Sequence, residues 1–151
     1  MKSAEPLKAY ATFRITGDAL VPEQVTRLLR IVPTRAYSKG EHYAGGPRSP
    51  DLIGRTGVWY FCTEGIVAGS RLSDHLIFLL RQVIPEPEQV GALRQLLQRK
   101  SLRATLTCFW HGARGSRRPS IPRSMTERLK QIPVAVGTDF DTEALGSREA
   151  A

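Results

Sequence analysis

Two segments of the chain alternate between apolar and mainly polar side chains, and this pattern limits the chain to folds built around a β-sheet. Between residues 102 and 111 every second residue, from Leu102 to Trp110, is apolar, and residues 9–16 repeat the pattern. Because successive side chains of a strand point to opposite faces, each segment is predicted to be a strand with one buried face. The sequence therefore favours a sheet with one face on an apolar core and a polar face turned away from it.

The rest of the chain supplies helices and two further strands. Proline at the first helical turn and apolar residues at helical spacing mark the helices, and short apolar runs mark the strands. In chain order we expect a helix over residues 22–31, a strand over 58–63 that is apolar on both faces, a heavily buried helix over 72–83, a third helix after Pro85 and Pro87, a helix opened by Pro122, and a last strand through 134–140.

The order of these elements predicts one α+β domain. A length of 151 residues suits a single core. The two ends resemble each other, because each has a strand followed by a helix that a proline opens. We therefore expect a mixed or antiparallel sheet of four to five strands covered by helices, ferredoxin-like with two related β-α-β halves. The domain is expected over residues 9–141, with an N-terminal extension at 1–8 and a disordered C-terminal tail at 142–151.

In one long segment, residues 38–57, apolar residues do not recur at the spacing of either a helix or a strand. Residues 38–57 hold five glycines and two prolines. This composition predicts a long loop, and loops of this length in compact domains are often functional. A ligand lid is one interpretation and mere mobility is the other, so the role of the loop stays open.

Charge and cysteine usage narrow the choice of partner and compartment. The chain has 22 basic and 14 acidic residues, a net charge of +8, and residues 101–130 hold seven Lys or Arg against Glu127 alone. Such a field attracts anionic ligands, nucleic acid or acidic proteins. No apolar stretch follows Met1 and the two cysteines lie in strand-like runs, so we expect a cytoplasmic protein with reduced thiols and no membrane partner. A homo-oligomer is left open.

Several short motifs together resemble a known family. The strings TFRITGDALVPEQVTRLLRIVPTRAYSKG, GVWYF and LSDHLIFLL, with Pro33-Thr34, Lys39-Gly40, Trp59 and His75 as recurring marks, are similar to the bacterial domain of unknown function family four-two-seven-nine. The similarity covers roughly residues 9–141. It implies an α+β fold in a bacterial, cytoplasmic protein. It transfers no catalytic residue, because no activity is assigned to the family.

The best candidate ligand site combines a short basic segment after the first helix with a tryptophan and a histidine from elsewhere in the chain. Thr34, Arg35 and Lys39 follow the first helix and could clasp an anionic group, Arg35 by its planar fork and Lys39 as a mobile charge. Trp59 and His75 complete this candidate site. The competing interpretation makes Arg35 a partner of helix-end carbonyls, Trp59 a core residue, and His75 a histidine bonded to a backbone carbonyl or loop at the core edge.

A nucleic-acid interface is the main alternative. Basic and aromatic residues on the polar face of a sheet can hold single strands by phosphate contacts and stacking. The string of glycine and aromatic residues typical of RNA-recognition sheets is absent, and threonines occupy several positions where stacking rings would be needed. The candidate residues for this interface are Arg14, Arg103, His111, Arg114, Arg117, Arg118 and Arg123.

The sequence contains no convincing pattern of catalytic or metal-binding residues. Ser73, Asp74 and His75 are consecutive on a helix and point in different directions, so they cannot form a triad. Cys108 and His111 are three apart on a strand and should face opposite sides of the sheet. We therefore predict no catalytic residue, metal or cofactor. The sequence favours a non-enzymatic binding or protein-interaction domain, with RNA binding second and a small-molecule enzyme third.

Overall fold

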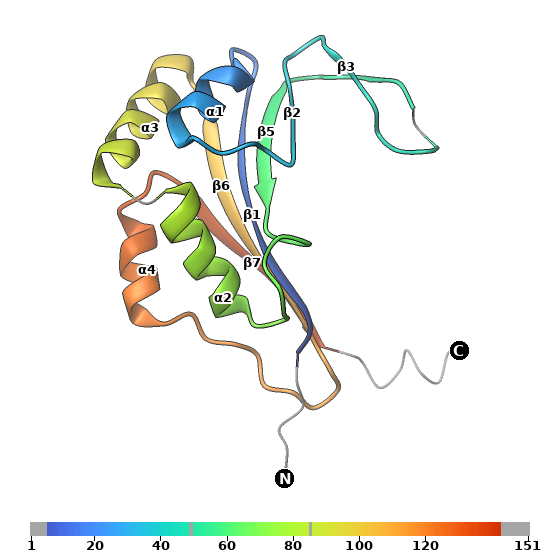
Figure 1. Ribbon diagram of the computed structural model, residues 1–151, viewed down its shortest axis with the longest axis vertical. Coiled ribbons are helices and arrows are strands. Elements are labelled where there is room, and N and C mark those ends of the chain that lie inside the picture. Colours follow the sequence, from blue (N-terminus) through green and yellow to red (C-terminus); the bar gives the residue numbers. More distant parts are fainter. Residues whose placement is uncertain (1–5, 49, 85, 143–151) are drawn as a thin grey trace.

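The alternating segments form the centre of a five-stranded sheet. The computed structural model describes residues 6–48, 50–84 and 86–142 (Figure 1). The elements are β1 (Pro6–Gly17), α1 (Pro22–Leu29), β2 (Arg35–Tyr37), β3 (His42–Tyr43), β4 (Leu52–Ile53), β5 (Gly57–Cys62), α2 (Leu72–Phe78), the π-helical turn η1 (Leu79–Val83), α3 (Pro87–Lys100), β6 (Arg103–Gly112), α4 (Arg123–Lys130) and β7 (Ala135–Thr142).

The strand order of the main sheet is β2-β5-β1-β6-β7. Neighbouring strands are antiparallel except β6 and β7, which are parallel. In the register of the sheet, Ile15 lies opposite Trp59 and Ala104, and all three are buried. Its neighbour Arg14 is exposed and lies opposite Tyr60. The two faces of the sheet therefore differ in the way that the alternation predicts.

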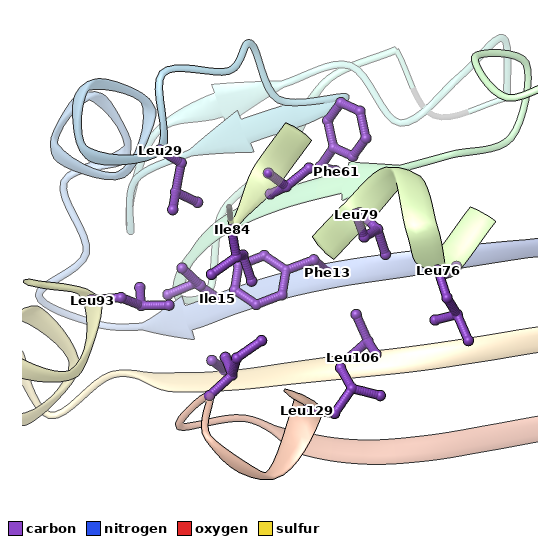
Figure 2. Close-up of a cluster of buried hydrophobic side chains, with 14 of the residues drawn as sticks. Phe13, Ile15, Leu29, Phe61, Leu76, Leu79, Ile84, Leu93, Leu106 and Leu129 are labelled. Atoms are coloured by element: carbon purple, nitrogen blue, oxygen red, sulfur yellow. The ribbon is translucent and has the colours of Figure 1, made fainter. Parts of the chain in front are cut away.

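All four helices of the described chain cover the same face of the sheet (Figure 1). Apolar side chains from the strands and helices meet between these two layers, as Phe13, Leu76 and Leu106 do in Figure 2. Removing such side chains from water is the main favourable contribution to folding. The prediction of an α+β fold with a mixed sheet of four to five strands covered by helices is confirmed.

The ferredoxin-like arrangement is not confirmed. The second half is a β-α-β unit, because α4 joins the parallel strands β6 and β7. The first half is not, because β1 and β5 are neighbours that run antiparallel. The chain inserts β2 and a hairpin between α1 and β5, and this extra passage reverses the direction in which β5 enters the sheet.

The segment 38–57 is not the featureless loop that its composition predicts. It contains the hairpin β3–β4, in which His42 pairs with Ile53 and Tyr43 with Leu52. The Gly54 amide donates to the Glu41 carbonyl at 2.9 Å, and the Gly40 amide donates to the Gly54 carbonyl at 2.8 Å. The hairpin extends on the side away from the helices (Figure 1).

The first and last strands mark the extent of the sheet along the chain. The first strand begins at Pro6, inside the segment 1–8 that was expected to be an extension. The last strand ends at Thr142. The rest of the expected tail, residues 143–151, lies outside the described residues. Helix α1 begins at Pro22 and ends before Arg30, whose φ of 57° is left-handed.

Candidate binding surface

No helix of the described chain covers the second face of the sheet (Figure 1). Residues directly opposite one another on paired strands share a face, so the register assigns its members. We call this surface the open face. It comprises Lys8, Tyr10, Thr12, Arg14 and Thr16 of β1, Arg35 and Tyr37 of β2, Val58, Tyr60 and Cys62 of β5, Arg103, Thr105, Thr107, Phe109 and His111 of β6, and Ala135, Gly137, Asp139 and Asp141 of β7.

The tyrosines of the chain gather on this surface. The sequence has four, of which Tyr10, Tyr37 and Tyr60 belong to the open face. The fourth, Tyr43 of the hairpin, stacks on Tyr37 with ring centroids 4.0 Å apart. Both tryptophans, in contrast, are buried in the core. Amphipathic rings are thus concentrated on the uncovered side of the sheet.

These rings are already in contact with one another and with cations. Tyr10 stacks on Phe109 at 4.5 Å. The Arg14 guanidinium lies 5.5 Å from the centre of the Tyr60 ring. Burial raises the pKa of the Tyr10 hydroxyl, so this hydroxyl stays neutral and can both donate and accept a hydrogen bond. The surface offers ring edges, hydroxyls and guanidinium groups in a fixed arrangement.

The cations of the open face are distributed unevenly. Arg35 lies 5.9 Å from the Tyr43 ring, near the β2 edge of the sheet. Lys8 pairs with Glu64 at 2.7 Å, and this hydrogen-bonded carboxylate raises the pKa of the lysine. At the opposite edge β7 contributes two carboxylates, Asp139 and Asp141. The β2, β5 and β1 side of the face is therefore basic and aromatic, and the β7 side is acidic.

The three predicted ligands after α1, Thr34, Arg35 and Lys39, are not all available to bind an anion together. The Thr34 hydroxyl accepts a hydrogen bond from the Cys62 amide at 2.8 Å, which ties the chain before β2 to the end of β5. Lys39 pairs with Asp18 at 3.2 Å. The Thr56 hydroxyl and then Lys39 lower the pKa of that carboxyl. Arg35 alone of these three predicted ligands reaches the open face.

Trp59 and His75, the other two predicted ligands, are buried on the helix side. Trp59 is 0% exposed and packs edge-on against Phe13. Its indole N–H donates to the Thr26 hydroxyl at 3.0 Å. Because Ala36 lies opposite Trp59, Arg35 points to the other face of the sheet. The five predicted ligand residues are thus divided between two faces and do not converge on one site.

His75 is part of a buried hydrogen-bonded network. It is 1% exposed, its Nε2 lies 3.0 Å from the Gly69 carbonyl, and its Nδ1 lies 2.6 Å from the Thr63 hydroxyl. A carbonyl can only accept, so Nε2 carries the proton and Nδ1 accepts from Thr63. The Ala11 amide donates to the same hydroxyl at 2.9 Å. This arrangement joins β1, the end of β5 and the segment before α2.

The predicted nucleic-acid ligands are also divided. Arg14, Arg103 and His111 lie on the open face, as the alternation predicts. Arg114, Arg117 and Arg118 are exposed in the connection from β6 to α4. Arg123 begins α4 and pairs with Glu127 at 3.1 Å, so it belongs to the helix layer. The sheet supplies three of the seven residues.

The sequence prediction missed Tyr37, Tyr43 and Tyr60. Residues 58–63 look apolar on both faces, because tyrosine and cysteine count as hydrophobic in a periodicity. In the structure Trp59 and Phe61 are buried in the core, whereas Tyr60 and Cys62 are half-buried on the open face. The signal that could have distinguished the two faces was the amphipathic Tyr60 between the wholly apolar Trp59 and Phe61.

The two cysteines differ in their surroundings. Cys108 is buried in the core and Cys62 is half-buried, and neither forms a disulfide. Cys108 and His111 point to opposite faces, as predicted. Among the described residues no group of three or more His, Cys, Asp and Glu side chains could hold a metal ion.

Burial raises the pKa of the Cys108 thiol from 9.0 to about 11. The neutral thiol is favoured by folding, so its contribution to stability is complete below pH 9.0 and is lost as the pH rises towards about 11. Iodoacetamide at mildly alkaline pH should label Cys62 first and Cys108 only after unfolding, as followed by mass spectrometry. A C62S variant that is labelled in the folded state as fast as the parent would contradict this order.

The fold and the open face together define an α+β domain with one helix-covered sheet face and one uncovered face that is aromatic and basic. Over residues 7–144 the chain matches the family described as a domain of unknown function (DUF4279), and it therefore belongs to that family. The resemblance inferred from its motifs is confirmed. Comparison with curated proteins and with solved structures gives no match. No helix of the described chain is long and apolar enough to cross a bilayer.

Proposed function

We propose that this protein is a non-enzymatic protein-interaction domain whose recognition surface is the open face. The observation that carries the proposal is the gathering of all four tyrosines, together with Arg14 and Arg35, on the side of the sheet that no helix covers. Tyrosine and arginine are among the residues that contribute most to binding energy at protein interfaces. Rings held by stacking lose little conformational freedom when a partner binds, which favours affinity.

The charge of the surface favours an acidic partner. Arg14, Arg35 and Arg103 are exposed, and the whole chain carries a net charge of +8. A positive surface attracts an acidic partner over a distance and orients it during encounter. His75, the histidine whose position suggested chemistry, has both ring nitrogens bonded to the protein itself, which supports a binding role over an enzymatic one.

Single-stranded RNA is the second candidate for the same surface. It is supported by the arginines and rings, but two observations favour protein. Tyr10 and Phe109 stack on each other, as do Tyr37 and Tyr43. One face of each of these four rings is therefore already covered by its neighbour. Base stacking needs a free ring face. In addition, Asp139 and Asp141 would repel phosphates along the β7 side of the surface.

The proposal is tested by site-specific photo-crosslinking. Benzoylphenylalanine at position 60, in place of Tyr60, should capture a partner in cells, and the same group at Gln98 on the exposed side of α3 should not. An Arg14→Glu change should reduce the capture about tenfold or more, because guanidinium anchors at interface centres contribute at least that much. Equal capture from both positions, unaffected by the charge reversal, would rule out the open face.

A titration with fluorescent single-stranded RNA at two salt concentrations distinguishes the two candidates. Under our proposal binding is weak and does not depend on Arg103. Tight binding that falls steeply with salt and is lost in an Arg14→Glu and Arg103→Glu double variant would replace the protein partner with RNA. We also propose a cytoplasmic location, which the two free thiols support because they suit a reducing compartment.

A further inference from the structure

The β7 edge of the sheet differs from the β2 edge. Strand β2 has three residues, and short edge strands offer little to pair with. Strand β7 has eight residues and an uninterrupted register against β6. It contains no proline or lysine, and its two charged side chains, Asp139 and Asp141, both lie on the open face. Within the described part of the chain, no strand pairs with its outer side.

An apolar groove runs beside this edge on the helix side. Its volume is about 250 Å³, and its lining includes Ile121, Leu129, Ile132, Val134 and Val136. Val136 lies beside the buried Leu106 in the register and so points towards the helix layer, yet it is 44% exposed. Unpaired backbone groups and uncovered apolar side chains thus occur together.

We propose that a second copy of this chain occupies the edge, with the two β7 strands antiparallel about a twofold axis near Thr138. Such an axis places Val136 opposite Phe140 of the partner subunit on the helix side. On the open face it places Asp139 opposite the partner's Gly137 and Asp141 opposite the partner's Ala135. Apolar residues then meet each other, and no two carboxylates lie directly opposite, which is the complementarity that a twofold interface requires.

The charge of the chain predicts how this dimer responds to salt. Two copies with a net charge of +8 each repel one another. Added salt screens that repulsion, so the dimer should become tighter as the ionic strength rises. An acidic or nucleic-acid partner on the open face would respond in the opposite direction, because salt weakens attraction between unlike charges. The salt response therefore separates this interface from the proposed function.

Sedimentation of the full chain over a range of concentrations tests the dimer. The parent protein should pass from monomer to dimer as its concentration rises. Val136→Lys should weaken the dimer at least about tenfold, because a charged side chain on an edge strand opposes pairing. Val32→Lys is the matched control, since Val32 is 78% exposed and lies outside the strands, and it should leave the dimer unchanged. Thermal melts of both variants should match the parent.

A cysteine at position 138 tests the twofold axis directly. Directly opposed residues on antiparallel strands have Cα atoms about 4.5–5.5 Å apart, which a disulfide can span. In a C62S background, Thr138→Cys should give a disulfide-linked dimer on mild oxidation, and Thr107→Cys, exposed on β6, should not. A chain that stays monomeric at every concentration, or equal cross-linking from both positions, would overturn the proposal.

Discussion

Replacement of Trp59 by alanine is expected to lower the free energy of unfolding by about 3–5 kcal/mol, the range for removing a large aromatic side chain from a core. Trp59 is 0% exposed, packs edge-on against Phe13, and lies on a strand with neighbours on both sides. Its removal leaves a cavity that the rigid sheet cannot close. Urea denaturation followed by circular dichroism measures the loss.

A second substitution separates packing from hydrogen bonding at the same position. Trp59→Phe keeps a ring in the core but removes the N–H that donates to Thr26. We expect this variant to lose about 1–3 kcal/mol, less than the alanine variant, from the unmade bond and the smaller ring. An alanine variant that loses under about 1 kcal/mol would contradict the central position of Trp59 in the core.

Replacement of Thr63 by valine should cost about 2–4 kcal/mol although the two side chains have nearly the same shape, because it leaves two buried polar groups without partners. The Thr63 hydroxyl accepts from the Ala11 amide and donates to Nδ1 of His75. Valine satisfies neither group. The loss should again appear as a lower midpoint in urea denaturation.

Two controls test whether the hydroxyl itself is responsible. Thr63→Ser keeps the hydroxyl and should recover most of the stability. Thr107→Val makes the same chemical change at an exposed position of β6 and should alter stability by no more than about 0.5 kcal/mol. If Thr63→Val and Thr107→Val were equally mild, the buried network would have no role in stability.

The connection between this network and function is indirect. Thr63 follows β5 directly, and its amide donates to the Ala11 carbonyl at 3.0 Å, which extends the pairing of the sheet. Tyr10, next to Ala11 on β1, and Tyr60 of β5 belong to the open face. The buried polar bonds on the helix side therefore hold in place the strands that carry the exposed rings.

The candidate site was predicted from sequence only in part. The period of two assigned Arg14, Arg103 and His111 to one polar face, and the register confirms this assignment. The proposed cluster of Thr34, Arg35, Lys39, Trp59 and His75 is not brought together in the structure. Proximity along the chain suggested the first three, but Thr34 and Lys39 bond to Cys62 and Asp18, which are distant in sequence.

Local periodicity determined by itself that β1 and β6 are strands, which of their side chains face the core, and that a helix opens at Pro22. These are properties of a few successive residues, and burial of an alternating or helical apolar pattern is enough to produce them. Tertiary structure alone decided that β5 pairs antiparallel with β1, that His42–Tyr43 pairs with Leu52–Ile53, and that Tyr43 reaches Tyr37. Such pairings depend on contacts between segments that are distant in the sequence. Their free energies depend on the whole molecule, so no local repeat of apolar residues reveals them.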